Sequence, residues 1–164
     1  MILPPNGLDE SLACCIKDSK RISASKRQIL DPMIRQHVTY ALGQSDVSEI
    51  DTINILQATL LAMTRAISAL SVSPNICLID GLHVPCLSSQ AIAIVKGDQK
   101  SLSIAAASII AKVARDRLMA DLGHTYPEFG WEHNAGYPTR THRAALDHYG
   151  ITPHHRRSFH TVGV

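Results

Sequence analysis

The sequence has few cysteines, no paired cysteine motif and no long hydrophobic run. Without C-x-x-C spacing we expect no disulfide framework and a reducing compartment. The longest apolar stretches are too short and interrupted to span a bilayer, and residues 1–5 lack the charged and apolar regions of a signal peptide. We therefore expect a cytoplasmic protein with no membrane partner. The cysteines are Cys14, Cys15, Cys77 and Cys86.

An excess of charge of one sign is also lacking. The formal net charge of +2 is too small by itself to indicate a nucleic-acid partner. The nine histidines show neither zinc-finger nor H-E-x-x-H spacing, which argues against a zinc site. The basic residues are unevenly placed, because from Lys96 onward nine Lys and Arg outnumber six Asp and Glu.

Residues 75–116 contain two short apolar runs that each end in an aspartate. The run 76–79 is followed by Asp80, and the run 91–95 is followed by Lys96, Gly97 and Asp98. Both runs are typical of buried strands of an α/β sheet, in which ligands bind outside the carboxyl ends of the strands. Because a buried carboxylate needs a positive partner, this pattern predicts a divalent metal site held by Asp80 and Asp98.

A helix is predicted directly after this pair of strands. Residues 103–122 are rich in Ala and contain no Gly or Pro. Ser108, Lys112 and Arg115 follow one another at i+4 and i+3, so they form a polar stripe on this helix. The stripe fits either a solvated face or a face turned toward the metal site, and its position after Asp98 favours the second interpretation.

The remaining pattern predicts a single α/β domain over residues 1–164, a length that supports one sizeable core. Ser23 is a good N-cap for a helix reaching about residue 36, and residues 37–43 have the composition of a strand. Apolar residues recur at helical spacing over residues 50–70, with Ser48 as a possible cap. Residues 129–139 are predicted to form a loop. Residues 142–149 are predicted to form a helix that Thr139 or Thr141 can cap and that ends at Gly150.

Seven blocks of sequence together resemble bacterial ribonuclease HII, in order and spacing across nearly the whole chain. They are DSKRIS at residues 18–23, INILQATLLAM at 53–63, LIDG at 78–81, VKGD at 95–98, SIAAASIIAKVARD at 103–116, GYPT at 136–139 and HHRRSF at 154–159. The resemblance implies a ribonuclease H-like mixed sheet flanked by helices. It also implies hydrolysis of the RNA strand of RNA–DNA hybrids, and cleavage at single ribonucleotides embedded in duplex DNA, with Mn²⁺ or Mg²⁺ as cofactor.

The resemblance also assigns roles to individual residues. Asp80 and Asp98 match catalytic carboxylates that bind the metal, and Tyr137 matches a tyrosine that contacts the deoxyribose at an RNA–DNA junction. Lys20 and Lys96 lie in motifs that line the substrate groove. The basic residues of the later motifs are candidates for phosphate contacts, which position a duplex without reading its bases. These candidates are Lys112, Arg115, Arg156 and Arg157.

The sequence departs from the family pattern at its N-terminus. The family opens with a strand carrying G-x-D-E-x-G-R-G, whose Asp and Glu are further metal ligands and whose Gly-Arg-Gly reads the ribose 2′-hydroxyl. No such motif occurs here, and Asp9-Glu10 falls in a predicted loop, so we do not transfer the role to this pair. We therefore expect a chain that lacks the N-terminal strand of the family.

Three hypotheses follow from this departure. The first is a monomeric ribonuclease HII whose sequence starts too late, which an upstream in-frame G-x-D-E-x-G-R-G in the gene would confirm. In this truncated form we expect weak or absent activity, because two carboxylates hold two ions poorly. The second is a remnant that binds RNA–DNA hybrids without cutting them. The third is a poorly folded structural remnant. Salt-sensitive binding, cleavage that depends on Asp80, and a cooperative thermal transition distinguish the three.

Overall fold

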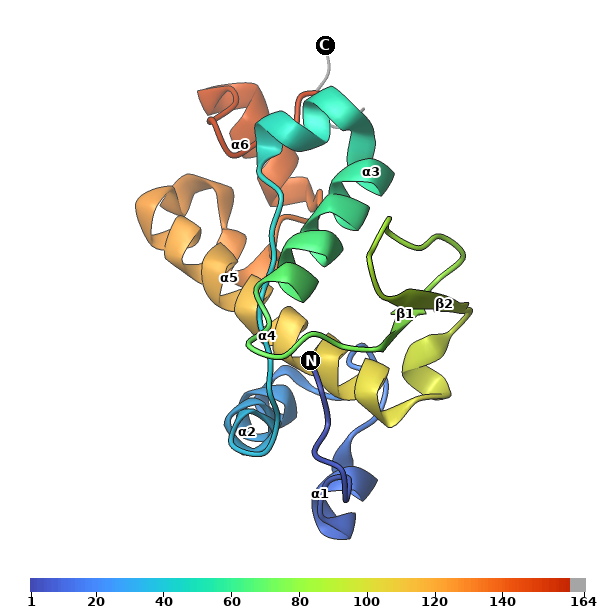
Figure 1. The fold of residues 1–164 in the computed structure, drawn as a ribbon. Coiled ribbons are helices and arrows are strands. Elements are labelled where there is room, and N and C mark those ends of the chain that lie inside the picture. Colours follow the sequence, from blue (N-terminus) through green and yellow to red (C-terminus); the bar gives the residue numbers. More distant parts are fainter. Residues whose placement is uncertain (160–164) are drawn as a thin grey trace. The chain divides into compact units, whose positions relative to one another are not determined.

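The computed structural model describes residues 1–159. Helices precede and follow a small parallel sheet along the chain (Figure 1), so the predicted α/β class is confirmed. The helices and strands are α1 (Glu10–Cys15), α2 (Ala24–Arg35), α3 (Val47–Ser68), β1 (Ile76–Asp80), β2 (Gln90–Ile94), the 3₁₀ helix η1 (Gly97–Gln99), α4 (Leu102–Thr125), the 3₁₀ helix η2 (Pro127–Phe129), α5 (Trp131–Asn134) and α6 (Arg140–Tyr149). Among residues 1–159, none of the helices combines the length and the apolar character that spanning a bilayer requires.

The chain forms two compact units, which are described separately. The first unit comprises Met1–Gln44 and Thr59–Val113, and the second comprises Ser45–Ala58 with the described residues from Ala114 onward. A single domain over residues 1–164 therefore stays a prediction.

The sheet of the first unit consists of β1 and β2, which run parallel with Asp80 opposite Ile94. Cys77 and Ile79 are each 7% exposed, whereas Ile76 and Leu78 are 54% and 40% exposed. Successive side chains of a strand point to opposite faces, so only one face of β1 is covered. No residue of β2 is buried. The expectation of two buried strands was therefore wrong for one face of β1 and for all of β2.

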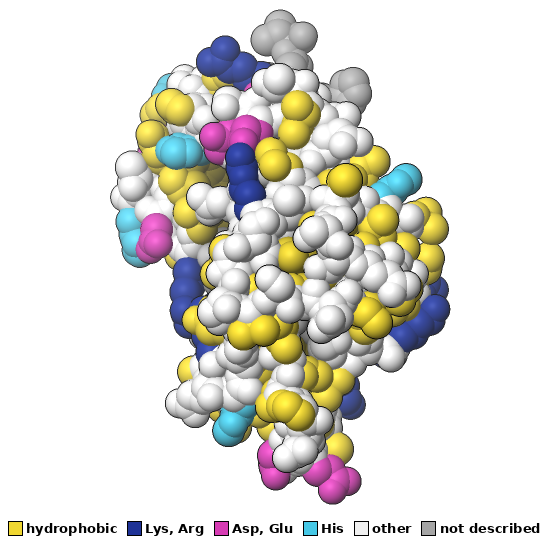
Figure 2. Space-filling view, in the orientation of Figure 1, with side chains coloured by type: hydrophobic (Ala, Val, Ile, Leu, Met, Phe, Trp, Pro, Cys, Tyr) yellow, Lys and Arg dark blue, Asp and Glu magenta, His cyan; other side chains and the backbone are white. Residues whose placement is uncertain are grey.

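Other large hydrophobic side chains are exposed as well. Ile29 on α2 and Leu82 after β1 are 63% and 76% exposed. On the face drawn in Figure 2, hydrophobic side chains cover much of the surface and charged side chains occur in small scattered groups.

The core of the first unit is built around one face of α4. Ala106 and Ile109 are fully enclosed, and the small alanine side chains allow neighbouring segments to approach the helix closely. The buried cluster consists of Leu12, Ile16, Ile22, Leu30, Ile34, Ala105, Ala106, Ile109, Ile110 and Val113. Ser23 caps α2 as predicted, because its hydroxyl accepts a hydrogen bond from the Lys26 N–H at 3.2 Å.

The strand predicted over residues 37–43 does not form. Only Thr39 pairs, through an isolated antiparallel bridge to Ile2 with hydrogen bonds of 2.7 and 3.2 Å. The β-branched and aromatic composition of this segment predicted a strand, but the described residues provide no continuous neighbour for it to pair with.

Helix α3 begins with a capping box, and Ser48, which the sequence suggested as a possible cap, is not the capping residue. Asp46, and not Ser48, accepts the Glu49 N–H at 2.8 Å, while the Glu49 carboxylate accepts the Asp46 N–H at 3.0 Å. The helix is interrupted at Asn54, whose φ of 67° and ψ of 166° are not helical. The Asn54 side chain accepts the Leu56 and Gln57 N–H groups at 3.0 and 3.1 Å, so it caps the second part of the helix.

The core of the second unit is aromatic. Phe129 and Trp131 are 1% and 2% exposed and stack with their ring centroids 5.2 Å apart. The segment predicted as a loop over residues 129–139 therefore supplies core side chains and contains the short helix α5. Thr139, one of the two threonines predicted as a cap, caps α6, and Gly150, with φ of 74°, follows its end.

Candidate functional site

The first candidate site residue, Asp80, ends strand β1 and is exposed. Its Oδ1 accepts a hydrogen bond from the Gly97 N–H at 2.8 Å. Lys96 has a left-handed conformation with φ of 56°, which turns the chain from β2 into η1. A side chain at Gly97 would lie 3.3 Å from Asp80 Oδ1 and 2.6 Å from Ile104 Cδ1, so glycine permits this close approach. The parallel strands thus bring Asp80 to the start of η1.

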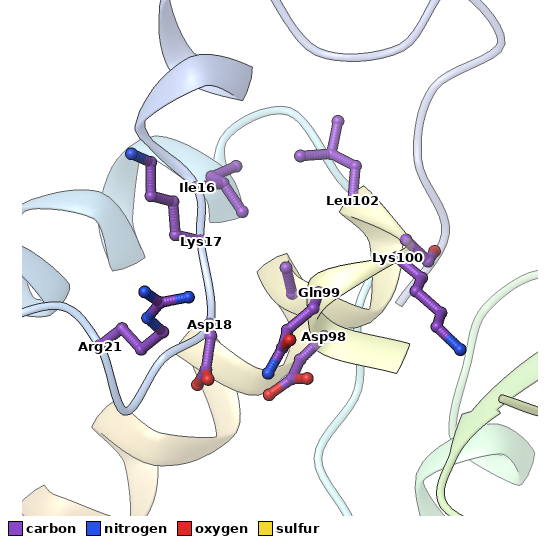
Figure 3. A pocket seen from close by; sticks show the side chains of 10 residues that line it. Ile16, Lys17, Asp18, Arg21, Asp98, Gln99, Lys100 and Leu102 are labelled. Atoms are coloured by element: carbon purple, nitrogen blue, oxygen red, sulfur yellow. The ribbon is translucent and has the colours of Figure 1, made fainter. Parts of the chain in front are cut away.

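Asp98 follows in the same turn and is half-buried. Partial burial, and then the negative charges of Asp18 and Asp80, raise the pKa of Asp98. A hydrogen bond with Asp18 acts in the same direction, and Lys20 opposes it. Figure 3 shows the carboxyl groups of Asp18 and Asp98 turned toward each other. The structure therefore gathers Asp80, Asp98 and Asp18 around η1.

Asp18 was missed by the sequence interpretation, which took only Lys20 from the DSKRIS motif. Asp18 Oδ1 accepts the Lys20 N–H at 2.9 Å, so the same carboxylate also shapes the turn that carries Lys20. An aspartate in such a polar segment predicts a turn, but it gives no local signal that Asp18 lies next to Asp98.

A buried arginine holds this turn in place. Arg27 on α2 donates through Nη1 to the carbonyl oxygens of Ser19 and Ile22 at 2.8 and 2.7 Å. A cavity of about 720 Å³ opens beside the turn and has charged residues of both signs in its wall. Its lining is Ile16, Lys17, Asp18, Arg21, Asp98, Gln99, Lys100, Ser101, Leu102 and Ala105.

The predicted basic residues of the first unit differ in exposure. Lys20 and Lys96 are exposed. Lys20 lies two residues after Asp18 in the sequence, and Lys96 lies two residues before Asp98. Lys112 is half-buried on α4.

Three predicted substrate-binding residues come together in the second unit. Although the Arg115 side chain as a whole is exposed, partial burial of its guanidinium and then the like charge of Arg156 lower the pKa of Arg115. Arg115 Nη2 lies 3.6 Å from the position of a side chain at Gly136, next to Tyr137, which is 68% exposed. Arginine stays charged at neutral pH, so the Arg115 cation lies near a second cation, Arg156, and near the phenol of Tyr137.

The last basic residues belong to a turn near the end of the described chain. The Arg156 guanidinium lies 3.8 Å from the centroid of the Phe159 ring, a cation–π contact. Arg157 is exposed, and its backbone N–H donates to Asp51. The candidate carboxylates and lysines thus lie in the first unit, and the candidate arginines and Tyr137 lie in the second.

The comparison with known proteins decides the family. The family model described as ribonuclease HII matches residues 2–162. The chain belongs to the ribonuclease HII family.

Individual relatives agree with this assignment. The chain is 49% identical over 163 residues to ribonuclease HII of Ruegeria pomeroyi, covering 99% of this chain and 68% of that protein. It is 53% identical over 148 residues to ribonuclease HII of a Ruegeria species, covering 90% of this chain and 65% of that protein. The chain therefore spans about two thirds of the length of these curated relatives.

A solved structure supports the fold. The structure is similar to ribonuclease H2 from Pyrococcus horikoshii, with a TM-score of 0.72, 28% sequence identity, and coverage of 93% of this chain and 81% of that one. The predicted membership in a family of ribonuclease enzymes and the predicted fold class are thus confirmed. The roles of the individual residues stay predictions.

Proposed function

We propose that this chain binds RNA–DNA hybrids and duplex DNA containing single ribonucleotides, and that it hydrolyses the ribonucleotide phosphodiester with Mn²⁺ or Mg²⁺. Membership in the ribonuclease HII family supports the reaction class. The observation that carries the proposal is the approach of Asp80 and Asp98 at η1. The Gly97 N–H orients Asp80 by a hydrogen bond, and the negative charge of Asp80 contributes to the raised pKa of Asp98.

The donor set fits a hard divalent cation. Asp80 and Asp98 offer carboxylate oxygens, which Mg²⁺ and Mn²⁺ prefer, and such ions commonly take one or two carboxylates together with water and substrate phosphate. The raised pKa of Asp98 supports this fit, because a cation would relieve the repulsion among the neighbouring carboxylates. When bound, the metal would supply activation of water and stabilisation of the leaving oxygen.

The other candidate residues would hold the nucleic acid. Lys20, Lys96 and Lys112 of the first unit, with Arg115, Arg156 and Arg157 of the second, would contact backbone phosphates, and Tyr137 would pack against a sugar. Phosphate contacts of this kind make affinity depend strongly on salt. Because they carry no sequence information, we propose binding that is independent of base sequence.

We propose that this hydrolysis is weak in the chain as it stands, and it would be absent in the non-catalytic alternative. Among residues 1–159 no group of three or more His, Cys, Asp or Glu is arranged to hold a metal ion. Two carboxylates hold a pair of ions less well than a larger set does, which lowers the fraction of chains with both ions in place. The alternative is a non-catalytic protein that binds hybrids without cutting them. A monomeric state and a cytoplasmic location stay predictions from the sequence.

A cleavage assay on duplex DNA containing one ribonucleotide separates the two functions. With saturating Mn²⁺, the enzymatic function predicts slow formation of the cleavage product by the wild-type chain, and no product from Asp80→Asn. Salt-sensitive binding with no product from either protein would instead support the non-catalytic alternative. Product that persists undiminished in Asp80→Asn would contradict the proposed site.

A further inference from the structure

Asp51, on the first part of α3, accepts three hydrogen bonds from a segment more than a hundred residues later in the chain. Its Oδ2 accepts the Arg157 N–H at 3.0 Å, and its Oδ1 accepts the Ser158 N–H at 3.0 Å and the Ser158 hydroxyl at 2.6 Å. The hydrogen bonds from Ser158 are the main cause of the lowered pKa of Asp51. The carboxylate is therefore ionised at neutral pH and fully engaged with this segment.

The segment that Asp51 holds is the turn that carries Arg156. The Phe159 N–H donates to the Arg156 carbonyl oxygen at 3.3 Å and closes the turn. Within this turn the Arg156 guanidinium lies over the Phe159 ring. The positive charge of Arg156 contributes to the lowered pKa of Arg115. Asp51 thus binds the backbone at the middle of the turn, between Arg156 and Phe159.

We propose that Asp51 is a positioning residue that keeps the Arg156–Phe159 turn in place, so that Arg156 and Arg157 are presented to the phosphates of a bound nucleic-acid duplex. The inference rests on the proposed function, because it concerns how that substrate is held. Two long cationic side chains lose much conformational freedom on binding phosphate, and a turn that is already ordered reduces this cost.

The sign of the effect distinguishes positioning from simple electrostatics. Removing a negative charge from a protein surface increases affinity for a polyanion. Loss of the contacts to Arg157 and Ser158 would have the opposite effect, because the cationic turn would no longer be held. Asp147 provides a matched control, since it is an exposed carboxylate on α6 in the same unit and its substitution changes the net charge equally.

The test measures binding of a labelled RNA–DNA hybrid over a series of salt concentrations. Asp51→Asn is expected to weaken binding about fivefold to tenfold, which is the scale of one charge-assisted contact. The slope of log affinity against log salt should become shallower by about 1, as for the loss of one phosphate contact. Asp147→Asn should bind as well as the wild type or more tightly. Unchanged or tighter binding by Asp51→Asn would overturn the inference.

A double-mutant cycle excludes a general loss of structure. In a chain with Arg156→Gln and Arg157→Gln, adding Asp51→Asn should change binding no further, because the side chains that it positions are gone. An equal loss in that background would overturn the inference. Ser158→Ala removes only the hydroxyl contact, and should shift affinity and salt slope in the same direction but less, even where Asp51→Asn fails to fold.

The two proposals fail differently. A folded wild-type chain that shows no salt-sensitive binding to the hybrid would overturn the proposed function. Wild-type binding that Ser158→Ala and Asp51→Asn leave unchanged would overturn only the positioning role of Asp51.

Discussion

Asp98 lies among carboxylates that oppose its ionisation. The pKa of Asp98 is raised by partial burial and by the charges of Asp18 and Asp80, so its charged form is less stable in the folded chain than in the unfolded one. Like charges gathered at a site reduce stability, and they are retained where function needs them. The same crowding that makes the group suitable for a cation therefore destabilises the chain without one.

Replacing Asp98 by Asn should stabilise the chain while removing any metal-dependent cleavage. In metal-free buffer at pH 7 we expect Tm to rise by about 1–3 °C, the scale of one like-charge contact at a partly exposed site. The gain should shrink as the pH falls through the raised pKa of Asp98, because the wild-type carboxyl then becomes neutral as well. Thermal unfolding followed by circular dichroism measures both effects. A variant with a lower Tm than the wild type at pH 7 would contradict this explanation.

His155 is a second residue whose protonation is linked to folding. It is 6% exposed, and its ring lies 4.8 Å from Phe129 and 5.3 Å from His142 between centroids. Its Nδ1 lies 3.0 Å from the Thr152 N–H, and its Nε2 has no hydrogen-bond partner among the described residues. Burial, and then the neighbouring His142, lower the pKa of His155 to about 4.

Stability should therefore fall as the pH is lowered from about 6.5, the ordinary histidine value, toward about 4. In this window the unfolded chain binds a proton that the folded chain does not, and the loss is on the order of 2–3 kcal/mol. His155→Asn should have a shallower dependence of unfolding free energy on pH, measured by urea unfolding at several pH values. His124→Asn, at an exposed position, is the control and should keep the wild-type slope. An equal slope in His155→Asn and the wild type would refute the linkage.

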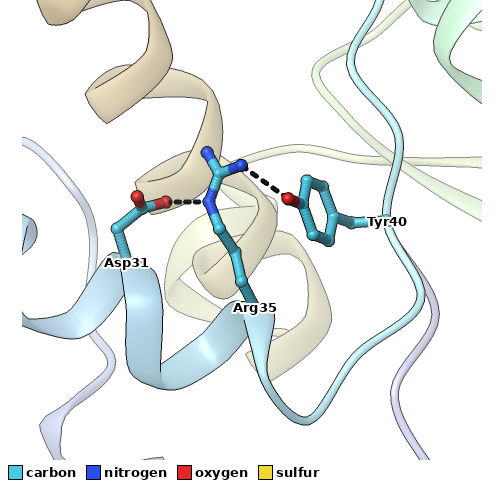
Figure 4. A network of polar contacts seen from close by, with 3 residues as sticks. All are labelled: Asp31, Arg35 and Tyr40. Carbon is cyan, nitrogen blue, oxygen red and sulfur yellow. Dashed lines mark hydrogen bonds and ion pairs between the residues drawn. The ribbon is translucent and has the colours of Figure 1, made fainter.

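At the scale of elements, several features that depend on local sequence signals were predicted correctly, and a strand that needed a long-range partner was not. Caps such as Ser23 and Thr139 follow from residues within one turn of the helix they begin. The segment 37–43 did not form a strand, because a strand needs a neighbouring strand to pair with and only Thr39 pairs here. Its Tyr40 instead accepts a hydrogen bond from Arg35 at 2.8 Å, and Arg35 also pairs with Asp31 at 2.6 Å (Figure 4).

The interruption of α3 predicts an unusual order of substitutions at Asn54. The backbone there has φ of 67° and ψ of 166°, a region almost confined to glycine, and the side chain caps the second part of the helix. Asn54→Ala should lower stability by about 1–2 kcal/mol, because it loses the cap and keeps the strain. Asn54→Gly should cost less, because relief of strain offsets the lost cap. Chemical unfolding of both variants measures their free energies of unfolding. A smaller loss of stability in Asn54→Ala than in Asn54→Gly would contradict the expected order.

For the whole molecule, nucleic-acid binding should depend on where the cations lie and little on the net charge of +2. Arg115 and Arg156 lie near each other in the second unit, whereas Arg140 and Arg143 are exposed positions on α6. The two pairs carry the same charge, so exchanging either pair for Gln changes the net charge equally.

We expect the Arg115→Gln, Arg156→Gln double variant to lose at least about tenfold in hybrid affinity, because two phosphate contacts disappear. The Arg140→Gln, Arg143→Gln variant should lose about threefold or less, the scale expected from a general change in charge. Fluorescence anisotropy at one fixed salt concentration compares them directly. Equal losses from the two pairs would show that net charge, and not position, governs binding.

The sequence alone determined the features that depend on neighbours along the chain. Strands ending at Asp80, a helix after Asp98 and a capped helix at the end of the chain follow from periodicity, composition and local hydrogen bonds, which act over a few residues. The motif order was also sufficient to indicate the family. These features were therefore accessible without coordinates.

Tertiary structure alone decided which distant residues meet. Asp18 approaches Asp98 across eighty residues of sequence, and Asp51 binds Ser158 across 107. The exposed face of β1 and the buried pair Phe129 and Trp131 likewise depend on which surfaces are covered, and covering is a property of the packed chain. Such contacts have no period or local signal in the sequence, because their partners are brought together only when the chain folds.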